Sequence, residues 1–364
     1  MSTVTQLLEV YHHFCSAVDE GKEIRVVFLD ITKAFDRVWH KGLSYKLKRC
    51  GIRGRLLAWF ADYLNDRLQR VVINGQYSDW GKVEAGVPQG SVLGPLLFLL
   101  YINDIVHVIH HCKIRLFADD TCLYIEVDDR EETARFINQD LEALSVWSKK
   151  WLVSFSAAKT KSLTISNKPD AGLNPPLSLE GVRIDQVSSH KYLGVYLSSN
   201  LKWKDHIEEV ALKARKRLSL MIPLKMKLDR KSLETMYNSF VLSTMQYAIT
   251  VWGGSPDCYI SKLERIHLDG LRLISGATAR SSSSQVLVEC NGQTIFEQIN
   301  HASLIMMYKI MHRKVPEYLS NIHVELQDEP MHNYNLRNKG NLRIPLCRLN
   351  TFQKSFFFLK LSKA

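Results

Sequence analysis

Two adjacent aspartates, Asp119 and Asp120, stand inside an apolar run from Lys113 to Val127. The β-branched and aromatic residues on either side predict two strands, which leaves the aspartates at the tight turn of a hairpin. Neighbouring carboxylates repel each other, and burial raises the pKa of at least one of them. A bound divalent cation would remove that penalty, but Asp is also a common turn residue without any chemical role. The pair alone leaves a metal site and an ordinary turn both open.

A third carboxylate favours the metal site. Asp30 ends an apolar strand that begins at Arg25, and a helix is expected to follow it. Mg²⁺ prefers a few carboxylates together with substrate phosphates. Asp30 and Asp119 together supply such a set.

A segment rich in Gly and Pro, from Gly86 to Pro95, separates these two stretches. Its glycines Gly86, Gly90 and Gly94 permit a close approach of the backbone to another group. An apolar helix over Leu96 to Ile109 is predicted to follow.

Five segments, in this order, resemble the reverse transcriptases of non-long-terminal-repeat retrotransposons of the LINE, jockey and chicken-repeat type. They are residues 28–36 (FLDITKAFD), 88–95 (PQGSVLGP), 117–120 (FADD), 155–159 (FSAAK) and 190–195 (HKYLGV). The resemblance implies an α+β fold: a right-hand polymerase palm, with a mainly antiparallel sheet and helices on one face, followed by a helical thumb. Family members carry more finger residues, and often an endonuclease domain, before this point. We therefore expect a chain that is truncated at its N-terminus.

The resemblance also implies two-metal nucleotidyl transfer. In that reading Asp30, Asp119 and Asp120 hold two ions, Mg²⁺ or Mn²⁺, with the backbone carbonyl of Ile31 as a further ligand. Phe35 would lie against the 2′ position of the incoming sugar and exclude a hydroxyl; the alternative is a core aromatic.

Other residues of the motifs receive supporting roles from the same resemblance. Gln89 and Gly90 would support the template strand and the incoming nucleotide, and Lys159 would lie near the nucleotide's phosphates. Relatives usually carry Asn where this chain has Ser156. Asp36 is interpreted as a structural residue that starts the next helix.

Two further groups are expected to contact the nucleic acid. The resemblance implies a primer grip at Tyr192, Leu193 and Gly194, where the glycine lets a turn approach the primer end. From residue 203 the sequence becomes helical, with an apolar stripe formed by Ile207, Val210, Ala211, Ala214, Leu218 and Met221. Three cations lie off this stripe and form either a solvated face or the duplex-binding face of a thumb: Lys213, Lys216 and Arg217.

The remaining elements follow from hydrophobic periodicity and turn signals. Helices are predicted over Ser2 to Ala17, His40 to Cys50, Leu56 to Leu64, Glu131 to Trp151, Leu233 to Trp252, Ile260 to Ile274 and Ile295 to His312. Strands are predicted over Leu163 to Ser166, Leu177 to Ile184 and Tyr192 to Leu197, with a hairpin turn at Asn74-Gly75.

The formal charge of +11 is concentrated in two regions. Residues 201–230 hold nine Lys and Arg against four Asp and Glu, and residues 331–364 hold seven without any acid. Such regional charge favours polyanionic partners, which the resemblance specifies as an RNA template, a DNA primer and deoxynucleoside triphosphates. Seven scattered cysteines and the lack of a signal peptide predict an intracellular protein of the nucleus or cytoplasm, with no membrane partner.

We expect a palm with a remnant of the fingers over residues 1–200, a thumb over 201–275, and a helical and basic C-terminal region over 276–364. The expected function is RNA-directed DNA polymerase. One alternative is an inactive relic that still binds nucleic acid. Another is an RNA-templated RNA polymerase, which Ala118 and the bulky Phe35 disfavour.

Overall fold

The computed structural model describes residues 2–168, 174–327 and 347–356. The chain forms two compact units. We call residues 23–164 and 168–187 the sheet unit, and residues 1–22, 165–167 and 188–364 the helical unit. The division into three domains that was expected at residues 200 and 275 stays a prediction, because the boundaries of the two units fall at other residues. Most of the basic C-terminal segment lies outside the described residues.

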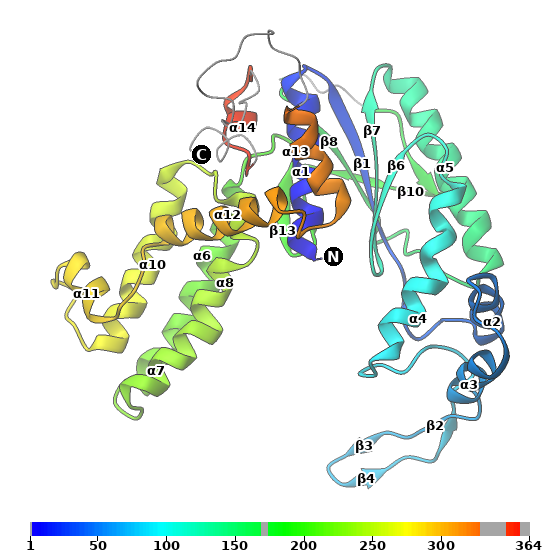
Figure 1. The fold of residues 1–364 in the computed structure, drawn as a ribbon, viewed down its shortest axis with the longest axis horizontal. Coiled ribbons are helices and arrows are strands. Elements are labelled where there is room, and N and C mark those ends of the chain that lie inside the picture. The colour runs from blue at the N-terminus through cyan, green and yellow to red at the C-terminus, as the bar shows by residue number, and fades with distance from the viewer. Residues whose placement is uncertain (1, 169–173, 328–346, 357–364) are drawn as a thin grey trace. The chain divides into compact units, whose positions relative to one another are not determined.

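A five-stranded sheet in the order β11-β8-β1-β7-β6 organises the sheet unit (Figure 1). Its strands are β11 (Asp185–Val187), β8 (Lys161–Ile165), β1 (Glu23–Asp30), β7 (Asp120–Val127) and β6 (Lys113–Phe117). The pairs β1–β7 and β6–β7 are antiparallel, whereas β8 and β11 are parallel. The expected α+β fold with a mainly antiparallel sheet is confirmed.

Helices cover one face of this sheet. Side chains alternate along a strand, so Val27 and Leu29 of β1 point to the same side, together with Leu123 of β7. The helical elements packed in that core are α2 (His40–Arg49), α3 (Gly54–Leu64), α4 (Leu93–Ile102), the 3₁₀ helix η1 (Asn103–Val108) and α5 (Arg130–Lys150). The amphipathic stripe of α5, from Ala134 to Trp147, is buried against the sheet and fixes its orientation.

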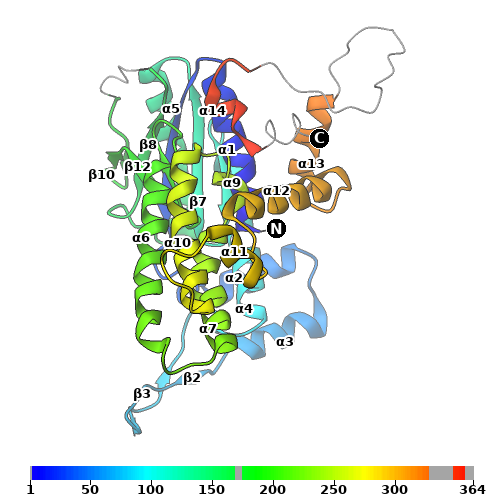
Figure 2. The same ribbon diagram turned by 90° about the vertical axis from the view of Figure 1, so that its left-hand side faces the viewer.

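A narrow β-ribbon leaves α3 and extends away from the rest of the sheet unit (Figures 1 and 2). It consists of β2 (Leu68–Gln69), β3 (Val72–Ile73), β4 (Gln76–Tyr77) and β5 (Gly81–Lys82). Asn74 and Gly75 both have positive φ, at 49° and 80°, as the predicted two-residue hairpin turn requires. Another short hairpin, β9 (Ser178–Leu179) with β10 (Val182–Arg183), completes the unit.

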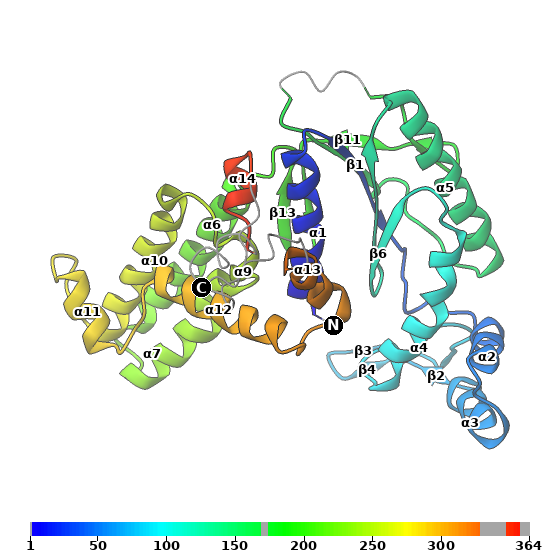
Figure 3. The same cartoon turned by 45° about the horizontal axis from the view of Figure 1, so that its top comes forward.

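The helical unit begins with α1 (Thr3–Asp19), which Ser2 caps in a reciprocal capping box with Thr5. The hairpin β12 (Ser189–Tyr192) and β13 (Val195–Ser198) leads into α6 (Lys204–Met221), whose predicted apolar stripe is buried. Helix α6 packs beside α10 (Asp257–Ser275) (Figures 2 and 3). The remaining elements are η2 (Ile222–Leu224), α7 (Arg230–Met236), the π-helix η3 (Tyr237–Leu242), α8 (Ser243–Gln246), α9 (Ile249–Trp252), α11 (Ser283–Glu289), α12 (Ile295–Met311), α13 (Glu317–Gln327) and α14 (Asn350–Gln353).

Several predicted elements are wrong in detail. The strand expected over residues 177–184 is the hairpin of β9 and β10, which turns at Glu180 and Gly181. The helix expected over residues 233–252 is divided into α7, η3, α8 and α9. The break between α8 and α9 lies where Ala248 adopts a left-handed φ of 52°, and the indole of Trp252 donates to the Tyr247 carbonyl there. The strand expected over residues 192–197 is a hairpin that turns at Leu193 and Gly194. Residues 32–37 form turns, so the helix expected directly after Asp30 begins only at His40.

Across the part of the chain that the structure describes, every helix is too short or too polar to span a bilayer.

Candidate active site

Asp30 and Asp120 face each other across two antiparallel strands. Strand β1 is buried from Glu23 to Leu29 and ends at Asp30, the residue directly opposite Asp120 in the register with β7. Buried Val and Leu side chains hold β1 in the middle of the sheet, so the position of Asp30 is fixed by packing rather than by the carboxylate itself. Two like charges at opposite positions destabilise a sheet, and a cation beside them would offset their repulsion.

The hairpin that carries the other two carboxylates is confirmed. Phe117 pairs with Asp120, which leaves Ala118 and Asp119 as a two-residue turn between β6 and β7. Ala118 has a φ of 51°, the left-handed conformation that tight hairpin turns demand at this position. Asp119 therefore lies in the turn itself, and Asp120 is the first residue of β7.

The three carboxylates influence each other electrostatically. Partial burial, followed by the charges of Asp119 and Asp30, raises the pKa of Asp120 above its ordinary value. A cation already lies beside the group, since Nζ of Lys159 is 3.3 Å from Oδ2 of Asp30. Lys159 belongs to the turn after Phe155, where its N–H donates to the carbonyl of Ser156 at 3.2 Å. Ser156 forms this turn in place of the expected Asn.

Oxygen donors at this edge of the sheet suit a hard divalent cation. Among residues 2–168, 174–327 and 347–356, no three carboxylate, imidazole or thiol groups lie close enough to hold one ion without further ligands. Mg²⁺ does not require them, because it is commonly held by one or two carboxylates together with water and substrate phosphates. The pair Asp30 and Asp120 fits that requirement, and their mutual repulsion gives a cation a favourable place.

The carbonyl of Ile31 is not used by the bridge that fixes this residue. Ile31 pairs with Phe155, and the bridge bonds run from Ser156 N–H to the Asp30 carbonyl and from Thr32 N–H to the Ser154 carbonyl. Ile31 is therefore held firmly while its own carbonyl oxygen takes no part in the bridge.

Phe35 is half-buried, and the centroid of its ring lies 4.8 Å from the ring centroid of Phe98 on α4. The ring thus combines a core contact with a partly open face, and both expected roles keep a structural basis.

Asp36 does not start a helix, and that interpretation is wrong. Its side chain is exposed and accepts a hydrogen bond from Nε2 of Gln89 at 2.8 Å.

The glycines of the 86–95 loop differ in what they permit. A Cβ atom on Gly86 would lie 2.8 Å from the Asp36 carbonyl oxygen, and one on Gly94 would lie 2.6 Å from that of Pro88. These two glycines therefore allow contacts within the protein. Gly90 has open space around it and a φ of 78°. Glycine is therefore favoured at this position by the left-handed backbone conformation, not by close packing. Near Gln89, a polar hollow of about 710 Å³ opens between the loop and the base of the β-ribbon.

The predicted primer-grip residues lie in the helical unit. Leu193 and Gly194 form the turn between β12 and β13, with φ values of 45° and 83°. The turn is covered rather than open: the hydroxyl of Tyr247 donates to the Leu193 carbonyl at 2.7 Å, and a Cβ on Gly194 would lie 2.9 Å from the ring of Tyr247. Tyr192 is buried, and its hydroxyl accepts from Gln6 at 2.7 Å.

The three cations predicted on α6 have different surroundings. Lys213 pairs with Glu209 at 3.0 Å. Arg217 donates to the carbonyl of Phe240 at 2.7 Å and to the hydroxyl of Thr244, so it supports the π-helix η3. Lys216 is exposed and makes no ion pair with any described residue.

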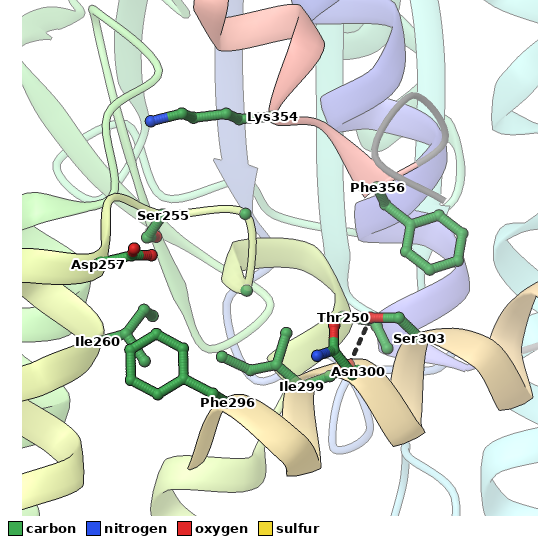
Figure 4. Close-up of a pocket in the computed structure, with 12 residues that line it drawn as sticks. Thr250, Ser255, Asp257, Ile260, Phe296, Ile299, Asn300, Ser303, Lys354 and Phe356 are labelled. Atoms are coloured by element: carbon green, nitrogen blue, oxygen red, sulfur yellow. Dashed lines mark hydrogen bonds between the residues drawn. The ribbon is translucent and has the colours of Figure 1, made fainter. Parts of the chain in front are cut away.

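Figure 4 shows a separate cavity of about 200 Å³ in the helical unit. Asp257 at the start of α10, Phe296 and Asn300 of α12, and Lys354 are among its lining residues. The hydroxyl of Thr250 is buried there without a hydrogen-bond partner among the described residues. None of the residues predicted to do chemistry lines this cavity.

Sequence reasoning missed the residues that hold these features in place. Asp140 on α5 is buried and accepts hydrogen bonds from the backbone N–H groups of His110, His111 and Cys112, at 2.7–3.1 Å. It thereby fixes the loop that enters β6 and the aspartate hairpin. A polar residue on the apolar stripe of the predicted helix was the available signal. Tyr247 gave no comparable signal, because its role depends on a turn 53 positions earlier.

Comparison with known proteins gives consistent matches. The family model described as reverse transcriptase (RNA-dependent DNA polymerase) matches residues 2–197. The probable RNA-directed DNA polymerase from transposon X-element of Drosophila melanogaster is 29% identical over 83% of this chain and 34% of that protein. The RNA-directed DNA polymerase from mobile element jockey of the same organism is 32% identical over 76% of this chain and 31% of that protein.

The chain thus spans about a third of the length of these curated relatives. Among solved structures, apo telomerase from Candida tropicalis aligns with 78% of this chain and 46% of that chain, at 12% identity and a TM-score of 0.44.

Proposed function

The chain belongs to the reverse transcriptase family, and from this premise we propose that it is the polymerase domain of a non-long-terminal-repeat retrotransposon, an RNA-directed DNA polymerase that extends a DNA primer on an RNA template. The observation that carries the proposal is the pair Asp30 and Asp120, set opposite each other where β1 ends and β7 begins. Folding has no reason to gather repelling carboxylates at one edge unless a cation and a charged substrate use them.

Reverse transcriptases in general depend on a divalent metal. In this chain Asp30, Asp119 and Asp120 would hold two ions, Mg²⁺ or Mn²⁺, with the Ile31 carbonyl as a further ligand. When bound, these ions would supply Lewis acidity for the attack of the primer 3′ oxygen on the α-phosphate and the departure of pyrophosphate.

The remaining residues bind and orient the deoxynucleoside triphosphate. The ammonium of Lys159, beside Asp30, is within reach of the same edge and would bind the nucleotide's phosphates. Phe35 would lie against the 2′ position of the sugar and exclude a hydroxyl. Gln89 and Gly90 would support the templating pair. The primer grip expected at Tyr192, Leu193 and Gly194 stays a prediction, because Tyr247 covers the glycine that was expected to approach the primer.

Binding of the template and primer duplex is assigned to the helical unit. Lys213, Lys216 and Arg217 lie on the exposed side of α6, away from its buried stripe. Phosphate contacts of this kind are independent of sequence and sensitive to salt. An intracellular location, in the nucleus or the cytoplasm, is part of the proposal, and the free thiols of the seven cysteines agree with it.

Primer extension tests the proposal. The chain is expected to incorporate dTTP on poly(rA)/oligo(dT) in the presence of Mg²⁺, and Asp30→Asn and Asp120→Asn should each abolish incorporation while remaining folded in a thermal melt. Duplex binding without any incorporation, by a folded wild-type chain, would refute the polymerase and leave a nucleic-acid-binding relic.

A further inference from the structure

Two loops of the sheet unit are tied together by hydrogen bonds that the sequence motifs do not account for. We call residues 35–40 and 86–89 the clamp. Its two segments are far apart in the sequence, yet their backbones pair directly. The paired groups are Gly86 N–H with the Val38 carbonyl and Val87 N–H with the Phe35 carbonyl, both at 2.8 Å.

A glycine makes this pairing possible. Gly86 has a φ of 92°, and a Cβ there would meet the backbone of Asp36 and Phe35 at 2.8–2.9 Å. Any other residue would push the two segments apart. His40 then closes the clamp, since its Nε2 lies 2.7 Å from the carbonyl oxygen of Gly86 and must donate to it.

The clamp also determines which end of the Gln89 amide is available. Nε2 of Gln89 donates to Oδ1 of Asp36 at 2.8 Å. An ionised carboxylate only accepts hydrogen bonds, so Asp36 requires the NH₂ end of the amide to face it. The amide oxygen of Gln89 is consequently turned away from Asp36, as a hydrogen-bond acceptor on an exposed loop.

We propose that Asp36 is a positioning residue for the polymerase reaction: it orients Gln89 so that the amide oxygen accepts a hydrogen bond from a hydroxyl or amino group of the incoming nucleotide. His40 and Gly86 hold the loop that carries Gln89 against residues 35–40. The inference rests on the proposed function, because the nucleotide is the ligand that Gln89 would meet.

A substitution that adds a negative charge at residue 89, followed by one that removes the charge at residue 36, tests the contact. Gln89→Glu sets two carboxylates against each other and should raise KM for dTTP about tenfold or more, since a hydrogen bond is replaced by repulsion. In Asp36→Asn/Gln89→Glu the new amide donates to the new carboxylate, which still presents an acceptor oxygen, so KM should return to within about threefold of wild type. Asp36→Asn alone keeps an acceptor for Gln89 and should change KM little.

Thermal melts and a control separate positioning from general stability. A structural role alone would lower the melting temperature and the active fraction, hence kcat, without moving KM. Asp62→Asn, which removes an exposed carboxylate on α3, should leave both constants unchanged. Equal KM values for Gln89→Glu with and without Asp36→Asn would overturn the inference while the wild type remains active. A wild type that incorporates no nucleotide would instead refute the proposed function, and the role of Asp36 with it.

Discussion

The ammonium of Lys159 lies 3.3 Å from Oδ2 of Asp30. This contact joins the turn after Phe155 to the carboxylate at the end of β1. Both side chains are well exposed, at 67% and 41%, so solvent screens the pair and its contribution to stability is small. The contact therefore matters for what it places at the edge of the sheet: an ammonium group next to a carboxylate that is expected to bind metal and substrate.

Replacing Lys159 should separate binding from stability. We expect Lys159→Gln to change the free energy of unfolding by less than about 1 kcal/mol, but to lower kcat/KM for dTTP roughly 10- to 150-fold, as the loss of a hydrogen bond to a charged phosphate predicts. Lys161→Gln is the matched control, since it removes a comparable ion pair, to Asp185 at 2.7 Å, outside the site. Equal kcat/KM in the two variants would contradict the role of Lys159.

Asp120 should make stability depend on pH in a defined direction. Its pKa is raised in the folded state, so the folded chain binds the proton more tightly and loses stability as the pH rises from the ordinary value of 3.8 through the folded value. Asp120→Asn should therefore be more stable than wild type at pH 7, and the difference should vanish below the ordinary pKa. Thermal melts between pH 3 and pH 8 measure it, with Asp62→Asn as the control.

Mg²⁺ should change the difference in stability between the wild type and Asp120→Asn. A cation held by Asp30 and Asp120 offsets their repulsion, so adding Mg²⁺ should raise the melting temperature of the wild type more than that of Asp120→Asn. An identical response of both proteins would argue against a metal at this pair.

Phe35→Val should weaken the selection of deoxyribonucleotides. Opening space for a 2′-hydroxyl is a steric effect, and a loss of about 2–3 kcal/mol in discrimination corresponds to roughly 30- to 150-fold in relative kcat/KM for dTTP against UTP. Because the ring also packs on Phe98, stability should fall by about 1–3 kcal/mol. Phe60→Leu, in the same core, should reduce stability alone. A preserved dTTP/UTP ratio in folded Phe35→Val would show that the ring only packs.

Lys216 and Arg217 are neighbours in sequence but should behave differently. Lys216→Ala should weaken duplex binding on all sequences alike and reduce the salt dependence by roughly 0.9 log unit. Arg217→Ala removes the donor to the Phe240 carbonyl and should lower stability by about 1–2 kcal/mol. Filter binding across a salt series, with Lys149→Ala on α5 as the control, measures the first effect, and urea unfolding the second. An unchanged salt slope for Lys216→Ala would make this face an ordinary solvated surface.

Hydrophobic patterning by itself determined most of the elements and the positions of the chemical residues within them. Alternating apolar residues around the aspartates specified the hairpin, and the stripe from Ile207 to Met221 specified the buried side of α6, because both signals depend only on local spacing. The five motifs of residues 28–195 identified the family for the same reason: each is contiguous in the chain.

Only the tertiary structure decided which of these groups meet. The register of β1 with β7 puts Asp30 opposite Asp120, although no local pattern specifies which strands pair. Asp36 looked like a helix start, but residues 32–37 form turns, Gly86 packs closely against the Asp36 backbone, and the Asp36 carboxylate accepts a hydrogen bond from Gln89. Tyr247, which directly precedes the left-handed Ala248, covers the turn at Gly194. Contacts of this kind depend on side chains distant in sequence, whose packing free energy overrides the local preference of each segment.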